Sequence, residues 1–127
     1  MANPEAIRAT VDGYVNAYGT NDRGAFLALW ADDGVLEDPV GTPAHQGLEA
    51  LGAFWDSARQ LADRIVLKPQ SITIAGSEAA MVMEINAHMG DGGMVLQAVD
   101  IMQCNDAGQL ESVRAFWDMA SATPLTP

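Results

Sequence analysis

Asp100 lies in the middle of an apolar run, residues 95–102, where a strand pattern calls for an uncharged side chain. The residues two positions away, which share its face in a strand, are Ala98 and Met102. An ionised carboxylate on such a face is costly to desolvate, so burial favours a raised pKa and a protonated group that donates a hydrogen bond. The alternative is that Asp100 lies at a solvated edge or meets a basic partner.

A second acid, Asp38, lies at the end of another apolar run and precedes Pro39. Two aspartates in different surroundings can serve as a base and an acid in one cavity. Glu37 is the rival acid, but side chains alternate along a strand, so only one of these two neighbours can face a cavity. We expect that residue to be Asp38.

Charge and composition narrow the range of partners. The chain has 127 residues, with 17 acidic against 6 basic side chains and a net charge of -11. Phosphate backbones and anionic membrane surfaces attract Lys and Arg, so we expect no nucleic-acid binding and no membrane insertion. An uncharged, hydrophobic small molecule is the easier ligand. Hydrophobic residues make up 49%, enough for a core, and the length suits one domain over residues 1–127.

Cysteine and histidine are scarce. Cys104 is the only cysteine, which excludes an intrachain disulfide and cysteine-based metal clusters. Only His45 and His88 offer imidazole ligands, so we expect no metal. No basic segment leads into an apolar N-terminal stretch, and no apolar run reaches the roughly 18 residues of a membrane span. We therefore expect a soluble, cytoplasmic protein.

Apolar spacing and turn residues divide the chain into helices followed by strands. A cap at Asn3 and Pro4 in the first turn favour an initial helix. In the first half we expect helices over 4–19, 22–30 and 47–61, a helix exit and turn at 31–34, a short strand over 35–38 and a loop over 39–43. In the second half we expect strands over 64–75, 78–89, 94–104 and 109–119, joined by turns.

This order predicts an α+β fold in which three N-terminal helices pack in a curved, mostly antiparallel sheet. A strongly twisted sheet can wrap around helices and leave a cavity between them. The first helix, the short strand and the long strands would then all contribute side chains to one cavity.

Particular residues also match a known family. They are Tyr14, Trp-Ala-Asp-Asp at 30–33, Glu-Asp-Pro-Val-Gly at 37–41, Gly47, Phe54, Val-Asp-Ile-Met at 99–102 and Ala-Phe-Trp at 115–117. From about residue 5 to residue 118 the chain resembles the ketosteroid isomerases, within the nuclear transport factor two-like, SnoaL-like class of cone-shaped domains. The Ala-Asp-Asp and Glu-Asp-Pro segment is typical of the whole class and identifies the fold. The combination of Tyr14, Asp38 and Asp100 is much more specific.

The resemblance implies a reaction and roles. Asp38 matches the base, and Tyr14 and Asp100 match the donors to the oxygen that becomes a dienolate. The substrate would be a β,γ-unsaturated 3-oxosteroid whose double bond moves into conjugation without a cofactor. The resemblance also implies a mixed sheet that forms a conical barrel with a deep apolar pocket, and a homodimer through the sheet.

Aromatic residues and one methionine are the candidates for substrate contact. Some relatives have further tyrosines behind the oxyanion tyrosine, where this chain has Trp30 and Trp55. An indole donates but cannot accept a hydrogen bond, so Tyr14 is expected to act without a tyrosine chain behind it. The alternative to ligand contact is that both tryptophans are core residues. The expected substrate contacts are Trp117, Trp55, Phe54, Met83 and Phe116.

Two other functions fit the same residues. One is a related cyclase or dehydratase that acts on a polyketide-like carbonyl with the same base and donors. The other is a non-catalytic binder of hydrophobic small molecules. A protonated Asp100 beside Tyr14 discriminates best, because a binder has no need of two strong donors at one oxygen.

Overall fold

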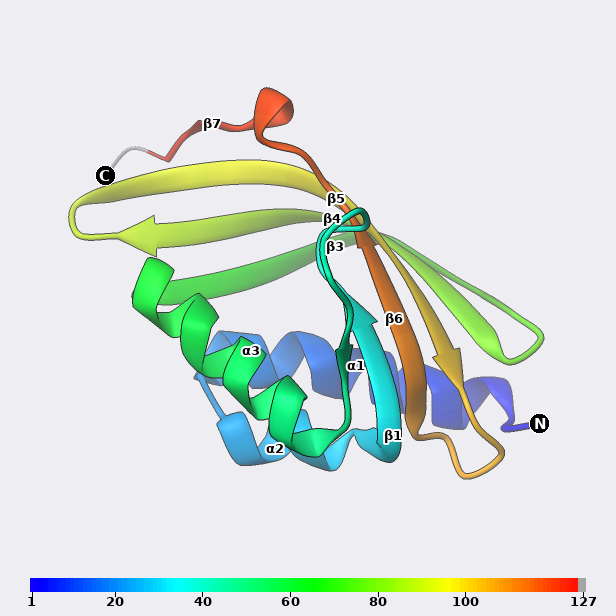
Figure 1. The fold of residues 1–127 in the computed structure, drawn as a ribbon. Coiled ribbons are helices and arrows are strands. Elements are labelled where there is room, and N and C mark those ends of the chain that lie inside the picture. Colours follow the sequence, from blue (N-terminus) through cyan, green and yellow to red (C-terminus); the bar gives the residue numbers. More distant parts are fainter. Residues whose placement is uncertain (126–127) are drawn as a thin grey trace.

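The computed structural model describes residues 1–125 as helices packed on one side of a curved sheet (Figure 1). The helices are α1 (Pro4–Thr20), α2 (Arg23–Ala28) and α3 (Leu48–Leu61). The strands are β1 (Trp30–Glu37), β2 (His45–Gln46), β3 (Arg64–Ala75), β4 (Glu78–Met89), β5 (Gly92–Cys104), β6 (Leu110–Phe116) and β7 (Thr123–Pro124). The predicted α+β class is confirmed.

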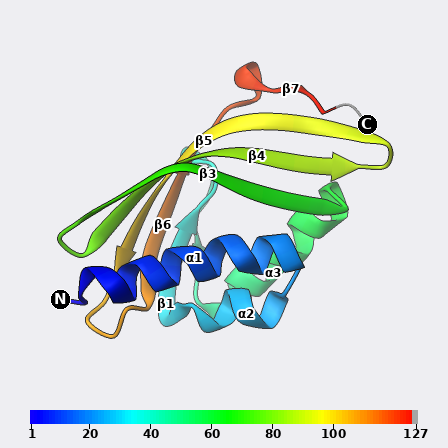
Figure 2. The same cartoon turned by 180° about the vertical axis from the view of Figure 1, so that it is seen from behind.

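The sheet is mixed and mostly antiparallel, as expected. Its order is β2-β1-β6-β5-β4-β3, and β7 pairs with β5. Of these pairs only β1 and β6 run parallel. Because β2 and β3 lie at the two ends of this order, the sheet does not close. The expected conical barrel is therefore an open cone. Figure 2 shows β3, β4 and β5 curving over the helices.

Helix α1 follows the local signals in its sequence. The Asn3 side chain caps it by accepting from the Ala6 amide at 2.8 Å, and Asn21 ends it in the left-handed conformation with φ 53°. This αL position suits asparagine. The buried face of α1 consists of Ile7, Val11, Tyr14, Ala17 and Tyr18.

Within residues 1–125, no helix is long and apolar enough to cross a membrane.

The boundary between α2 and β1 differs from the prediction. The expected helix through Trp30 ends at Ala28, and the expected turn at 31–34 is part of β1. Trp30 pairs with Leu110 of β6, and a register shift follows before the next pair at Val35. The apolar spacing of residues 26–30 fits a helix, but pairing with β6 decides the conformation, because tertiary contacts override a local pattern.

The end of the chain also differs. The expected strand over 109–119 stops at Phe116, and Asp118 caps a 3₁₀ helix at Met119–Ser121 by accepting from the Ser121 amide at 2.9 Å. The short strand β7 pairs with Met94 and Val95 of β5 and was not predicted. The Asp118 cap therefore competes with the strand, and β6 ends at Phe116 although the strand pattern of the sequence continues beyond it.

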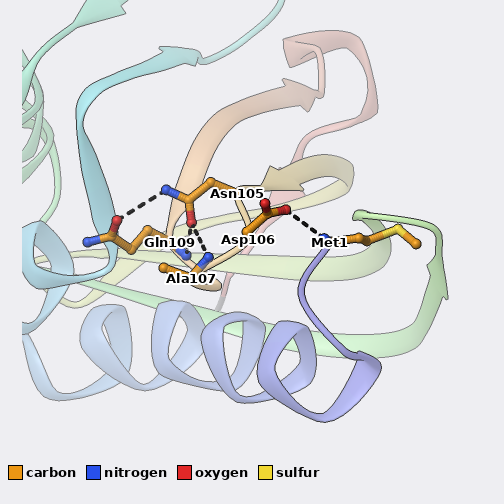
Figure 3. A network of polar contacts seen from close by, with 5 residues as sticks. All are labelled: Met1, Asn105, Asp106, Ala107 and Gln109. Carbon is orange, nitrogen blue, oxygen red and sulfur yellow. Dashed lines mark hydrogen bonds and ion pairs between the residues drawn. The ribbon is translucent and has the colours of Figure 1, made fainter.

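The turn between β5 and β6 is held by one side chain, as Figure 3 shows. The Asn105 side-chain oxygen accepts from the Ala107 amide at 3.0 Å and from the Gln109 amide at 2.9 Å. The Met1 ammonium group pairs with Asp106 at 2.6 Å. The start of the chain is therefore tied to the predicted turn at 105–108.

Candidate active site

A cavity of about 330 Å³ lies between the helices and the concave face of the sheet. Side chains from α1, α3, β3, β4, β5 and β6 line it, together with Asp38 and Pro39 beyond β1. The walls are mostly apolar, and the size falls within the range of about 300–1,000 Å³ that is usual for small-molecule sites. The polar groups on its surface come from Tyr14, Tyr18, Asp38, Ser57, Asp100 and Trp117.

Asp100 lies in β5 and is only 2% exposed. Its register partners are Met81 and Ala115, and the same-face neighbours Ala98 and Met102 are buried too. One carboxyl oxygen, Oδ1, has no hydrogen-bond partner among residues 1–125. Burial, and then the nearby charge of Asp38, raise the pKa of Asp100 well above its ordinary value. A raised pKa favours the protonated form, which can donate a hydrogen bond to a ligand oxygen.

Asp38 sits at the end of β1 and is half-buried. Its Oδ1 accepts a hydrogen bond of 2.6 Å from the Trp117 indole Nε1. Burial raises the pKa of Asp38, while the Trp117 bond and the charge of His45 act in the opposite direction. Glu37 points away from the cavity and pairs with Arg114 at 3.4 Å. Of the two adjacent acids, only Asp38 therefore faces the cavity, as strand alternation predicts.

Tyr14 is 1% exposed and lines the same cavity from α1. Burial raises the pKa of its hydroxyl well above 10, and Tyr18, Asp100 and Asp38 contribute in the same direction. The phenol therefore stays neutral and keeps a proton to donate. The cavity thus contains all three predicted reactive groups: Asp38, Asp100 and Tyr14.

Three of the five expected substrate contacts line the cavity: Trp117, Phe54 and Met83. Phe116 does not, because β6 presents Ala115 to the cavity and the next side chain to the opposite face. Phe116 is 40% exposed, with the Arg114 guanidinium 5.2 Å from its ring centroid. The structure therefore does not bring Phe116 into this cavity.

The remaining expected contact, Trp55, belongs to the aromatic core. Its ring packs 4.9 Å from Tyr18 and 4.7 Å from Phe26, centroid to centroid, and it is not part of the cavity lining. Trp30 is likewise buried against Phe26, and its Nε1 has no hydrogen-bond partner within residues 1–125. Trp30 therefore makes no hydrogen bond to Tyr14, which agrees with the core alternative for both tryptophans.

Two residues near the reactive groups were not predicted as part of the site. Tyr18 lines the cavity one helical turn after Tyr14, and the four-residue spacing between them was the signal that could have found it. His45 in β2 lies near the base, where its charge lowers the pKa of Asp38, and its ring centroid is 5.1 Å from that of Phe54. Its position depends on the short β1–β2 pairing, which has no local signal.

The comparisons with known proteins agree with this geometry. The model of the SnoaL-like domain matches residues 11–113, so the chain belongs to the SnoaL-like domain family. A Steroid Delta-isomerase of Nocardioides simplex is 29% identical over 111 residues, which are 87% of this chain and 89% of that protein. The predicted membership of the SnoaL-like class is thereby confirmed.

Solved structures share the fold at low sequence identity. A computationally designed 17-OHP binder superposes with a TM-score of 0.84 at 23% identity, over 94% of this chain and 95% of its own. The epoxide hydrolase/cyclase-like enzyme SalBIII, with a role in pyran ring formation in the polyether salinomycin, gives a TM-score of 0.86 at 20% identity, over 96% and 98%. These two likenesses establish the cone fold.

Proposed function

We propose that this protein is a cofactor-free isomerase that moves the double bond of a β,γ-unsaturated 3-oxosteroid into conjugation. The observation that carries the proposal is the meeting of two aspartates in different surroundings with a tyrosine in one apolar cavity. Asp38 is half-buried and receives an indole hydrogen bond, whereas Asp100 is fully buried without a partner for Oδ1. One carboxyl is thereby suited to be a base and the other to be a neutral acid.

Asp38 is the proposed base. As a carboxylate it removes a proton from the carbon between the ketone and the double bond. The electron pair of the broken C–H bond forms a double bond to the carbonyl carbon, and the carbonyl π pair moves onto the oxygen. The same group then returns the proton to the carbon two positions further along, which completes the shift with no net gain or loss of protons. The Trp117 bond at 2.6 Å holds the carboxylate in one orientation between the two transfers.

Tyr14 and Asp100 are the proposed donors to the dienolate oxygen. Both are at most 2% exposed, so water competes little for the negative charge that develops there. Donors fixed in such surroundings stabilise the transition state more than the neutral ketone, and each is usually worth about 10²–10³ in rate. The name of the curated relative from Nocardioides simplex supports the same reaction.

The proposal is tested by adding a Δ5-3-oxosteroid to the purified protein and recording ultraviolet absorbance, because only the conjugated product absorbs strongly. Asp38→Asn removes the base while the side-chain shape remains, so turnover is expected to fall by about 10²–10⁴. Glu37→Gln is the matched control, since it neutralises the adjacent acid on the opposite face. Full activity in Asp38→Asn would remove this residue from the mechanism.

The same assay separates the other two functions. Tight steroid binding by calorimetry without turnover would indicate a hydrophobic binder. Conversion of a polyketide-like ketone, with the steroid unchanged, would indicate a cyclase or dehydratase.

The proposed functional unit is a homodimer in which the outer face of the sheet is covered. Val82 and Phe116 are 37% and 40% exposed and lie in one cross-strand row through Val99 on that face, and adjoining exposed apolar side chains suit a protein contact. Light scattering after size exclusion tests this state, and a monomer at micromolar concentration would contradict it.

The cytoplasmic location also stays a prediction.

A further inference from the structure

The cavity extends well beyond the three reactive groups. On its sheet side, register partners of β4 and β5 form successive rows, from Met81 opposite Asp100 to Met89 opposite Gly92. Asp100 and Met89 both line the cavity, so it reaches from the first of these rows to the last. The two rows are eight residues apart along β4, which corresponds to about 26 Å at the usual rise of a strand.

A steroid nucleus held at the reactive end would fill only the inner part of this length. Its ketone oxygen would lie about 3 Å from the Asp100 carboxyl, within hydrogen-bond distance. Four fused rings with C–C bonds of about 1.5 Å extend for about 10 Å from that oxygen. The nucleus would therefore end near the row of Ile85 and Leu96, because Leu96 lies four residues before Asp100 in β5. Two further rows lie beyond this point.

The outer part of the cavity is apolar on all its walls. We call it the distal subsite, and its lining residues are Leu61, Ala62, Ile65, Ala87, Met89 and Met94. Ile65 and Met94 are the register partners of Ala87 in β3 and β5, so these three side chains form one row. None of the six lining side chains has a hydrogen-bonding group apart from the weakly accepting thioethers of the two methionines.

The end of α3 closes the distal subsite from the side opposite the sheet. The amide of Asp63, directly after this end, donates to the His88 carbonyl at 2.8 Å. His88 lies between Ala87 and Met89, so this bond holds the end of α3 beside the outer rows. Figures 1 and 2 show the same arrangement, with the last turn of α3 next to the ends of β3 and β4.

The distal subsite is also the mouth of the cavity. At the inner end Asp100 and Met83 are each 2% exposed, whereas Met89 is 37% and Leu61 is 76% exposed. Large apolar side chains at an open end form a surface that an apolar ligand group can cover. Methionine side chains adapt to irregular shapes, which suits a flexible hydrocarbon chain better than a rigid ring.

We propose, on the basis of the proposed function, that the distal subsite binds a hydrocarbon side chain at the far end of the steroid nucleus. The preferred substrates are then β,γ-unsaturated 3-oxosteroids with an alkyl chain at C17. With C–C bonds of about 1.5 Å, a chain of eight carbons extends for about 9 Å and crosses both outer rows to the mouth. A ketone or hydroxyl at C17 would enter the same rows without a side chain to bond, which disfavours it.

A series of substrates with increasing chain length tests this proposal. Androst-5-en-3-one, pregn-5-en-3-one and cholest-5-en-3-one carry zero, two and eight side-chain carbons on the same reacting rings. We expect KM to fall along the series, by at least tenfold from the first to the last, since each buried methylene is worth about fourfold in affinity. The kcat should change less than about threefold, because the chain contacts the ground state and the transition state equally. Cyclodextrin keeps all three in solution, and KM refers to the free steroid.

Two variants change the distal subsite. Ala87→Phe fills the row of Ile65 and Met94, and we expect the ratio of kcat/KM for the cholestenone over the androstenone to fall at least tenfold. Leu61→Glu brings a carboxylate to the mouth and should lower the same ratio several-fold. Because Leu61 is so exposed, this variant tests the proposal even if Ala87→Phe does not fold. His88→Phe is the matched control, since it adds the same ring next to Ala87 but on the opposite face of β4, and it should leave the ratio unchanged.

The outcomes separate this inference from the function on which it rests. If no steroid is turned over, the isomerase proposal fails, but calorimetry with 5α-androstan-3-one and 5α-cholestan-3-one still tests the distal subsite. These saturated ketones have no double bond to move, and the cholestanone should bind at least tenfold more tightly. Equal KM values along the series, or equal affinities of the two ketones, would overturn the subsite. A ratio that is unchanged in both variants would overturn it as well.

Discussion

Replacing Asp100 by Asn should change the free energy of unfolding in a pH-dependent way. The difference between the variant and the unaltered chain should shift in favour of the variant as the pH rises from acid to neutral. Asp100 is 2% exposed, and its pKa is raised by burial and by Asp38. The native state therefore holds this proton at pH values where the unfolded chain has lost it. By linkage, the free energy of unfolding decreases as pH rises from the unfolded pKa of about 3.9 toward the native pKa. Asp100→Asn removes that contribution.

The size of the effect comes from the proton linkage. Each pH unit in this window is worth about 1.4 kcal/mol for one group. While Asp100 stays protonated in the native state, the difference between variant and unaltered protein should grow by about 2.4 kcal/mol from pH 4 to pH 6. Taking the difference cancels every other group that titrates equally in both proteins.

Urea unfolding at half-unit pH intervals measures this difference directly. Met83→Leu is a suitable control, because it changes the cavity wall without changing a titratable group. Its difference from the unaltered protein should not depend on pH. An Asp100→Asn difference that is constant from pH 4 to pH 6 would refute the neutral-acid assignment, since it would mean that the native and unfolded pKa values of Asp100 are equal.

Three further predictions concern the base, the donors and the core. Trp117→Phe removes the 2.6 Å bond that lowers the pKa of Asp38, so the acid limb of the kcat/KM profile should move to higher pH; an unmoved limb would contradict this reading. Phenolic steroids should bind more tightly than saturated 3-oxosteroids by calorimetry, with the preference reduced in Tyr14→Phe, because the site suits an oxyanion; equal affinities would speak for a simple binder. Gly34→Ala should lower the free energy of unfolding by about 1–3 kcal/mol, because the added Cβ would lie 2.5 Å from the Trp30 ring; unchanged urea unfolding would show that the ring can move.

Much of the fold follows from local patterns. The spacing and caps of α1, the period of α3 and the alternation in β4 were sufficient to place these elements, because each buries one face of a regular element. The segment from Trp30 to Gly34 was not predictable in this way. Its extended form depends on pairing with β6, and its local apolar spacing fits a helix equally well.

The candidate site divides in the same manner. The unusual position of Asp100 was visible in the sequence, since its same-face neighbours in the strand are apolar. The role of Tyr14 came from the family resemblance, because a tyrosine on an amphipathic helix has no distinctive pattern. The outward orientation of Phe116 required the structure. Because successive side chains of a strand point to opposite faces, Phe116 and Trp117 cannot both face one cavity. This rule alone does not tell which of the two faces inward.

By itself, the sequence determined the class of fold, the acidic and apolar character of the chain, and the presence of an acid among apolar residues of a strand. Only the tertiary structure decided which side chains share the cavity and brought Arg59 over Trp55 beside Tyr18. The reason is physical: burial and local propensity act along the chain and leave a periodic pattern. The meeting of side chains from α1, α3, β4 and β5 depends on the curvature of the sheet, which is a property of all its strands together.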